Sequence, residues 1–235
     1  MGKFLHAFFS PLGFRRAVPQ VWDGFQTNIK LMVIAELLVL VFALVVAIVR
    51  GLPGRGAFPL RWLAIGYTDF FRGTPLILVA YVWGLGIPSI HAGIISNQSL
   101  FTYGIISLTL VYTAYVTEVY RAGIESVHPS QRMASRSLGL TYAQTMRYVI
   151  LPQAIRRVVP PLLNDFIGLQ KDTAIITVIG VTDALAQAGF YSNDFFSYAG
   201  YTLAAVFFVI LTIPFARFTD HLIKQREQLE RGQLV

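Results

Sequence analysis

The sequence of 235 residues contains no cysteine and few charges. Without cysteine, the chain has no disulfide framework, no thiolate metal site and no thiol nucleophile. Its charged residues amount to 13% of the sequence, whereas a soluble domain usually carries about 25%. The histidines lie far apart in the sequence, at His6, His91, His128 and His221. No metal site and no thiol chemistry are therefore expected of this chain.

Apolar residues dominate the composition instead. They make up 55% of the sequence, and the mean hydropathy is +0.59. This composition is typical of a membrane protein. The net charge of +7 does not indicate a nucleic acid partner, because Lys and Arg stand between apolar blocks rather than in one dense patch.

Long apolar runs predict an all-α membrane protein with about five transmembrane helices. A helix needs about 20 apolar residues to cross a hydrocarbon core of about 30 Å. Four runs approach or exceed this length: Asn28 to Val49, Ala64 to Ile87, Leu100 to Tyr120 and Tyr201 to Phe218.

A further run, Leu151 to Val181, is long but uneven. Prolines and polar residues interrupt it at Pro160, Pro161, Asn164, Asp165, Lys171 and Asp172. Polar groups are tolerated at membrane depth where they face a cavity or other helices. We expect this run to be a span that lines a pathway, and the alternative is a re-entrant segment that does not cross.

The basic residues predict the orientation of the chain. They gather between Arg50 and Arg61, between Arg121 and Arg157, and from Arg217 onward, whereas neither Pro88 to Ser99 nor Thr182 to Gly200 contains Lys or Arg. The positive-inside rule places the basic groups in the cytoplasm and the two uncharged loops outside. With this orientation, the polar segment after the third span is a cytoplasmic loop between spans three and four.

The N-terminal residues are predicted to lie in the membrane interface. Phe4 to Phe14 is too short to cross, contains Pro11 and lacks a small-residue cleavage site. An odd number of spans leaves the N-terminus outside, where three basic residues contradict the positive-inside rule: Lys3, Arg15 and Arg16. The expected organisation is an interfacial segment over 1–27, a transmembrane domain over 28–220 and a cytoplasmic tail over 221–235.

The stretch from Gln131 to Gln153 is more polar than its surroundings. Ser130 is the expected N-cap of a short helix, and Gly139 suits the left-handed residue that ends it. Thr141 and Gln144 form a capping-box pattern at the start of a second helix. The residues fit two arrangements equally, a knob docked in a groove of another protein or a helix pair lying on lipid.

This stretch resembles the cytoplasmic EAA loop of ABC importer permeases. Met133-Ala134-Ser135 takes the place of Glu-Ala-Ala, Gly139 is the glycine of the pattern, and Val149 to Pro152 matches its closing Ile-x-Leu-Pro. The spacing of the glycine and of Leu-Pro matches that of the family. Because Met133 replaces the glutamate, an ion pair that this glutamate makes in the family cannot form here.

Three further stretches resemble the polar amino acid uptake branch of the same family. They are FRGTPLIL at Phe71 to Leu78, VTEVYRAGIESV at Val116 to Val127 and QKDTAIITVIGVTDAL at Gln170 to Leu185. They occur in the order of the family, and the resemblance covers most of the chain, from Leu60 to Phe215.

The resemblance implies the permease subunit of an ATP-driven importer of polar amino acids in the bacterial inner membrane, similar to histidine, glutamine or arginine permeases. The implied partners are a second permease subunit of the same or a related chain, two ABC ATPase subunits, an extracytoplasmic amino acid binding protein and membrane lipid. The chain has no phosphate-loop motif, so it is not expected to be an enzyme, and ATP and Mg belong to the ATPases. The implied ATPase-coupling residues are Met133, Ala134, Ser135, Arg136, Leu138, Gly139 and Pro152.

An amino acid zwitterion requires hydrogen-bond donors for its carboxylate and acceptors for its ammonium group. The candidate pathway residues are Thr74, Glu118, Asp165, Lys171, Asp172 and Thr173. Some have a structural alternative, since Glu118 precedes Arg121 at the spacing of a helical ion pair. Glu36 lies in the middle of the first span, where a charge is costly unless it is paired.

Other classes of membrane protein remain as alternatives. A secondary transporter usually has internally repeated halves, and the two halves of this chain show no repeat. A membrane enzyme requires a catalytic constellation near one face, which the carboxylates of this sequence do not suggest. A non-transporting scaffold subunit would simply bury the uneven span against its neighbours.

Overall fold

The structure, a computed structural model, describes residues 7–52, 54–91 and 93–232. All its regular elements are helical. Lys3, His6 and the start of the expected interfacial segment lie outside the described residues. The α-helices are α2 (Pro11–Arg50), α3 (Phe58–Gly73), α4 (Leu76–Tyr81), α5 (Ile87–Ser89), α6 (Leu100–Glu125), α7 (Pro129–Ser137), α8 (Tyr142–Thr145), α9 (Leu151–Asp172), α10 (Ala184–Phe195) and α11 (Ala199–Gly232). Two π-helices are η1 (Val82–Gly86) and η3 (Met146–Ile150), and two 3-10 helices are η2 (Gly93–Ser96) and η4 (Thr173–Ile179).

Within the described residues, 3 helices are long and apolar enough to cross a membrane, and the number rises to 5 if each of two bent helix pairs is one span. The long helices are α2, α6 and α11. The prediction of an all-α membrane protein with about five spans is confirmed. The helix of the first span does not begin at Asn28, because α2 continues unbroken from Pro11.

The second predicted span is not a single straight helix. Phe58–Gly73 and Leu76–Ser89 meet at an angle of 105°. Between them, Thr74 adopts an extended conformation with φ −101° and ψ 126°. Pro75 is the physical reason, since proline lacks a backbone N–H and disfavours a helical conformation of the residue before it. The run from Leu151 also bends, by 54°, where it meets α10.

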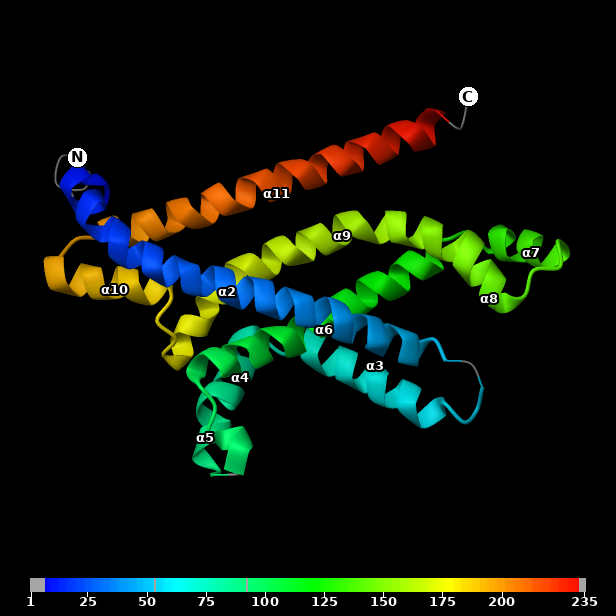
Figure 1. Cartoon of the computed structure of the whole chain (residues 1–235), viewed down its shortest axis with the longest axis horizontal. Coiled ribbons are helices and arrows are strands. Elements are labelled where there is room, and N and C mark those ends of the chain that lie inside the picture. Colours follow the sequence, from blue (N-terminus) through cyan, green and yellow to red (C-terminus); the bar gives the residue numbers. More distant parts are fainter. Residues whose placement is uncertain (1–6, 53, 92, 233–235) are drawn as a thin grey trace.

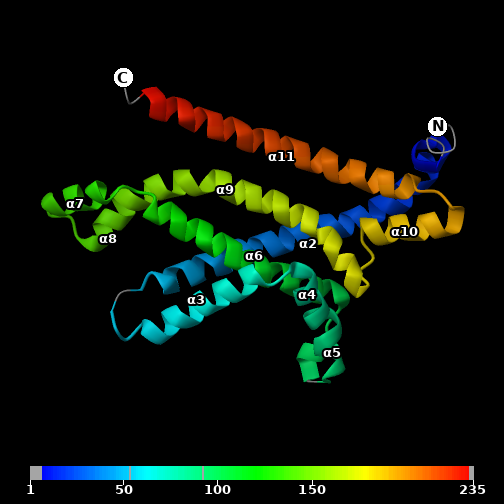
Figure 2. The ribbon, with the colours of Figure 1, turned by 180° about the vertical axis from the view of Figure 1, so that it is seen from behind.

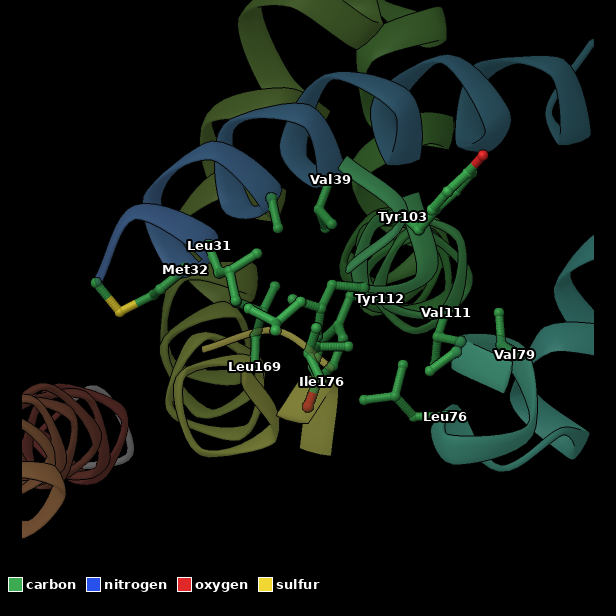
Figure 3. Close-up of a cluster of buried hydrophobic side chains, with 14 of the residues drawn as sticks. Leu31, Met32, Val39, Leu76, Val79, Tyr103, Val111, Tyr112, Leu169 and Ile176 are labelled. Carbon is green, nitrogen blue, oxygen red and sulfur yellow. The ribbon is translucent and has the colours of Figure 1, made fainter. Parts of the chain in front are cut away.

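Helix α6 lies at the centre of the main core. Its buried residues Tyr103, Val111 and Tyr112 pack with Leu31 and Val39 of α2 and with residues of the other elements around it: Leu76 and Val79 of α4, Leu169 of α9 and Ile176 of η4. Figure 3 shows the labelled side chains of α2, α4, α9 and η4 gathered around α6. This core therefore packs α4 of the first bent pair, and α9 with η4 of the second, against the straight helices α2 and α6.

A second apolar cluster joins the N-terminal half of α2 to α10 and α11. It is rich in small side chains, which allow helix backbones to approach closely. Gly24 shows how close this approach is, because a Cβ added there would lie 2.4 Å from the Asp183 carbonyl oxygen. The members of the cluster are Ala17, Val21, Phe25, Ala184, Ala188, Tyr191, Ala199, Leu203 and Ala204.

The two ends of the molecule carry different segments. Figures 1 and 2 show α7, α8, the connection from α2 to α3 and the C-terminal end of α11 at one end. The N-terminal end of α2 and helix α10 lie at the other end. The three basic groups of the sequence therefore share one end, as the positive-inside argument requires.

Candidate functional site

The loop between α6 and α9 contains the two predicted short helices, α7 and α8. The expected N-cap Ser130 is wrong, because α7 begins at Pro129 and His128 is its N-cap. The His128 Nδ1 atom accepts a hydrogen bond from the Ser130 backbone N–H at 3.2 Å. Proline favours the first position of a helix, where its missing N–H has no cost, and this moves the helix start upstream of Ser130.

The other local signals of this loop are confirmed. Gly139 follows α7 with a left-handed φ of +78°. Thr141 and Gln144 form both hydrogen bonds of a capping box at the start of α8, at 2.9 and 3.3 Å. The loop therefore has a defined shape, in which a tight glycine turn separates two short helices.

The loop presents apolar side chains to its surroundings. Met133 is 63% exposed, Leu138 81% and Tyr142 72%. Ser135 is the exception among the predicted coupling residues, because it is buried and donates a hydrogen bond to the Gln131 carbonyl oxygen. The remaining six are exposed: Met133, Ala134, Arg136, Leu138, Gly139 and Pro152. An exposed apolar patch on a polar loop is typical of a protein interaction site.

The base of the loop is fixed to both α6 and α9. Val127, Ile150 and Ala154 form a small buried apolar cluster at this point. Above it, α6 and α9 cross so closely that a Cβ added at Gly123 would lie 2.1 Å from Val158 Cγ1.

Arg157 of α9 adds a polar contact to this base. Its guanidinium donates a hydrogen bond to the Ser126 carbonyl oxygen, immediately after α6. Apolar packing and this hydrogen bond together join the base of the loop to both helices.

A cavity of about 440 Å³ lies between α3, α6 and α9, directly above the base of the loop. Its polar lining comes from all three helices, namely Arg72, Tyr115, Glu118, Ser126, Arg157 and Asp165. Of the predicted pathway residues, the structure brings Glu118 and Asp165 into this cavity.

Glu118 is held by two arginines. The expected pair with Arg121 is confirmed, with Arg121 Nε donating to the carboxylate at 3.0 Å. Arg50, at the end of α2, donates to the other carboxylate oxygen at 2.8 Å. Sequence reasoning missed Arg50, because no local pattern connects it with α6.

Asp165 has the opposite environment. Its Oδ2 atom is buried and has no hydrogen-bond partner among the residues that the structure describes. Glu36 is close enough to interact electrostatically with Asp165, and it lines a neighbouring cavity of about 280 Å³ between α2, α9 and α11. A carboxylate without a partner is costly at membrane depth, so Asp165 is the polar residue of this wall that the fold itself does not explain.

The other four predicted pathway residues lie elsewhere. Thr74 is at the bend between α3 and α4 and donates to the Phe70 carbonyl at 2.8 Å. Lys171 is exposed, and Asp172 accepts a hydrogen bond from Tyr112 at 2.8 Å. Thr173 is fully buried, so the structure does not bring these four residues into one site.

Thr173 belongs to a buried polar network that the sequence analysis did not identify. The side-chain amide of Asn28 donates to Thr173 Oγ1 at 3.1 Å and to Asp183 Oδ2 at 3.0 Å. Its carbonyl oxygen accepts from the Ala184 backbone N–H at 2.9 Å. One asparagine in α2 thus joins η4 and the start of α10, and the only signal in the sequence is a polar residue in an apolar helix.

A bundle of straight and bent spans, with an open cavity that charged side chains line in part and an anchored exposed loop, defines the class of membrane permeases. The family of binding-protein-dependent transport system inner membrane components matches residues 40–228 of the chain, and the chain belongs to this family.

Individual relatives agree with this assignment. The chain is 37% identical over 207 residues to the probable glutamine ABC transporter permease protein GlnM of Bacillus subtilis, covering 88% of this chain and 93% of the relative. It is 33% identical over 210 residues to the glutamate/aspartate import permease protein GltJ of Escherichia coli K12, covering 84% of each.

Solved structures show the same fold. A crystal structure of an amino acid ABC transporter with histidines matches with a TM-score of 0.83 and 32% identity, over 92% of this chain and 97% of that one. The inward-facing methionine ABC transporter MetNI matches with a TM-score of 0.63 and 19% identity, over 88% and 94%. The resemblance to ABC importer permeases is confirmed.

Proposed function

We propose that this chain forms the translocation pathway of an ATP-driven amino acid importer in the bacterial inner membrane. The names of its relatives, which refer to glutamine and to glutamate/aspartate, support an amino acid substrate. Two permease subunits, the same or related, form the pathway together. Two ATPase subunits bind the α7–α8 loop, and an extracytoplasmic binding protein delivers the substrate at the opposite end.

The observation that carries this proposal is the physical link between the loop and the cavity. Helices α6 and α9 both line the cavity, through Glu118 and Asp165. The same two helices hold the loop, through the Gly123–Val158 crossing and the hydrogen bond from Arg157. A displacement of α7 is therefore transmitted to the cavity wall through packed side chains rather than through a flexible linker.

The coupling step is mechanical. Closure of the ATPase pair moves residues 130–151 as one rigid lever, and α6 and α9 tilt with it to switch access to the cavity. ATP and Mg bind to the partner ATPases, and this chain contributes no catalytic residue. The exposed coupling residues form the contact with the ATPase, while Ser135 supports the shape of α7 from inside.

The cavity offers complementary groups to a zwitterion. Asp165 lines the cavity, and its carboxylate accepts from the ammonium group, while the guanidinium groups of Arg72 and Arg157 donate to the carboxylate of the substrate. Glu118 is already neutralised by its two arginines and acts as a structural residue of the wall. Thr74, Lys171, Asp172 and Thr173 lie outside this cavity and remain candidates for other parts of the pathway.

Reconstitution tests the proposal. The chain is placed in proteoliposomes with its ATPase and binding protein, and ATP hydrolysis and amino acid uptake are both measured. Leu138→Asp, which places a charge in the exposed apolar patch, is expected to lower coupled uptake by at least about tenfold, the scale of a central interface residue. Leu138→Met keeps the patch apolar and serves as the matched control.

Three results would overturn this function. Uptake by the chain without an ATPase would define a secondary transporter. Unchanged, ATP-coupled uptake by the Leu138→Asp variant would show that the patch does not contact the ATPase. Absence of any uptake, with the ATPase bound and active, would leave the alternative of a scaffold subunit.

A further inference from the structure

Two basic residues lie at the wrong end of the molecule for the positive-inside rule. Arg15 and Arg16 are exposed on α2 near its N-terminal end. Figures 1 and 2 show this end beside α10 and the start of α11, far from the α7–α8 loop. Basic residues on the outer side of a membrane protein are depleted, so their presence calls for a local partner.

Arg16 lines a cavity at this end, whereas Arg15 is not one of the residues that line it. The cavity has a volume of about 430 Å³ and lies between the start of α2 and the connection from α10 to α11. Within the described ranges 7–52, 54–91 and 93–232, the Arg16 side chain forms no hydrogen bond or ion pair. The other lining residues are mainly apolar or hydroxyl-bearing: Ala7, Ser10, Leu12, Gly13, Tyr191, Phe195, Phe196 and Ser197.

Phe196 is held out of the fold at this cavity. It is 93% exposed, and its φ of +49° is in the left-handed region that bulky residues rarely adopt. Such a conformation persists only where the surrounding structure imposes it, and it is typical of functional positions. Phe195 beside it and Leu12 across the cavity are also exposed, at 52% and 59%.

Aromatic pairs are frequent in the segments that form the cavity. Phe8 stacks on Tyr198 with ring centroids 5.1 Å apart, and the ring centroid of Tyr191 lies 4.8 Å from that of Phe195. Further pairs are Phe9–Phe14 and Tyr198–Tyr201. Tyrosine is enriched at the level of the lipid headgroups, so the exposed rings of Tyr198 and Tyr201 support a position of the cavity in the membrane interface.

We propose that this cavity binds an anionic phospholipid of the outer leaflet. The guanidinium of Arg16 contacts the phosphate and the acidic headgroup, because it is the cation of the cavity without a protein partner among the described residues. Phe195, Phe196 and Leu12 contact the glycerol and the upper part of the acyl chains. An acidic protein surface fits less well, since the exposed apolar side chains of Leu12, Phe195 and Phe196 line the same cavity as the cation.

Lipid retention measured by native mass spectrometry tests this site. The transporter, purified with its partner subunits in mild detergent, is mixed with phosphatidylglycerol or with phosphatidylcholine. Arg16→Gln is expected to weaken phosphatidylglycerol binding about fivefold, the effect of one basic residue near an anionic surface. Phosphatidylcholine binding changes less. Arg15→Gln removes the same charge one residue away, outside the cavity, and retains phosphatidylglycerol like the unmodified chain.

A second variant tests the apolar part without removing a charge. Phe196→Ser is expected to weaken the binding of both lipids, because it removes a ring that contacts their common part. Equal losses with Arg15→Gln and Arg16→Gln would overturn the proposal in favour of diffuse attraction, and so would no loss with Arg16→Gln. If Arg16→Gln weakens only the binding of inorganic phosphate, the cavity is a free-anion site. If it weakens only the binding of the extracytoplasmic binding protein, the cavity is a protein contact. Either result would also overturn the proposal.

Discussion

Arg50 Nη1 lies 2.8 Å from Glu118 Oε2, although 68 residues separate them in the sequence. The ion pair joins the end of α2 to α6 next to the cavity wall. Glu118 also accepts from Arg121, so a single carboxylate pairs with two guanidinium groups. The Arg50 and Glu118 side chains are only 14% and 22% exposed, and Glu118 is the acid that contacts both arginines.

The first prediction compares the two sides of this ion pair. Glu118→Leu leaves Arg50 without its acid and Arg121 with Glu125 alone, and we expect it to lower the free energy of unfolding by about 2–3 kcal/mol. Arg50→Met is expected to lower it by only about 1 kcal/mol, because Glu118 keeps Arg121 as a partner. Thermal unfolding of the purified permease in detergent measures both.

Glu125→Gln is the control for this comparison. Glu125 pairs with the same Arg121, but its side chain is 59% exposed, so its loss should change the stability by less than about 1 kcal/mol. Equal effects of Glu118→Leu and Glu125→Gln would contradict the assignment of Glu118 as the central acid.

The second prediction concerns the helix crossing beneath the cavity. Gly123→Ala places a Cβ in collision with Val158, whose branched side chain cannot move away easily, and overpacking of this kind costs about 1–3 kcal/mol. We expect reduced coupled uptake in proteoliposomes, because α6 and α9 are forced apart above the loop. Val158→Ala in the same chain should restore much of the uptake.

Gly66→Ala is the matched control. Gly66 lies in α3 with no atom within 4 Å of an added Cβ, so alanine there should stabilise the helix by up to about 1 kcal/mol and leave uptake unchanged. If Gly123→Ala transports normally, the close crossing is not required for coupling.

The third prediction concerns the buried network of Asn28. Asn28→Leu removes the amide that donates to Thr173 and Asp183 and that accepts from the Ala184 N–H. Each buried polar group left unsatisfied costs about 1–3 kcal/mol. We expect a marked fall in the Tm of the purified permease. Gln26→Leu, at an exposed position of the same helix, should leave the Tm nearly unchanged. A small effect of Asn28→Leu would show that water or another group replaces the amide.

The sequence analysis succeeded where the physical signal is local. Gly139 and the Thr141–Gln144 capping box are confirmed, because a glycine at positive φ and a capping box depend on a few neighbouring residues. Ser130 was misassigned within such a local pattern, since Pro129 and His128 offered a competing helix start. The apolar runs also identified the spans, because their length follows from the thickness of the bilayer.

Contacts between distant segments were not predictable in this way. Asn28 and Asp183 are 155 residues apart, and neither sits in a pattern that specifies the other. The cavity brings together Arg72, Glu118 and Asp165 from three helices. Whether these residues come close depends on the direction of α3, which ends at the bend before Pro75. Helix packing angles decide these contacts, and one sequence alone contains no signal for them.

The last prediction separates substrate binding from stability at Asp165. An uncompensated carboxylate in a membrane cavity costs free energy, and its replacement by a neutral amide in Asp165→Asn removes this cost. We therefore expect the variant to unfold at the same or a higher Tm, while uptake falls at least about tenfold in kcat/KM because the negative charge that pairs with the ammonium group is lost. Asp172→Ala is the comparison, since Asp172 accepts a hydrogen bond from Tyr112 and the loss of this acceptor should lower the Tm. Normal uptake by Asp165→Asn would exclude this carboxylate as a substrate ligand, whereas a lower Tm would show that it stabilises the bundle instead.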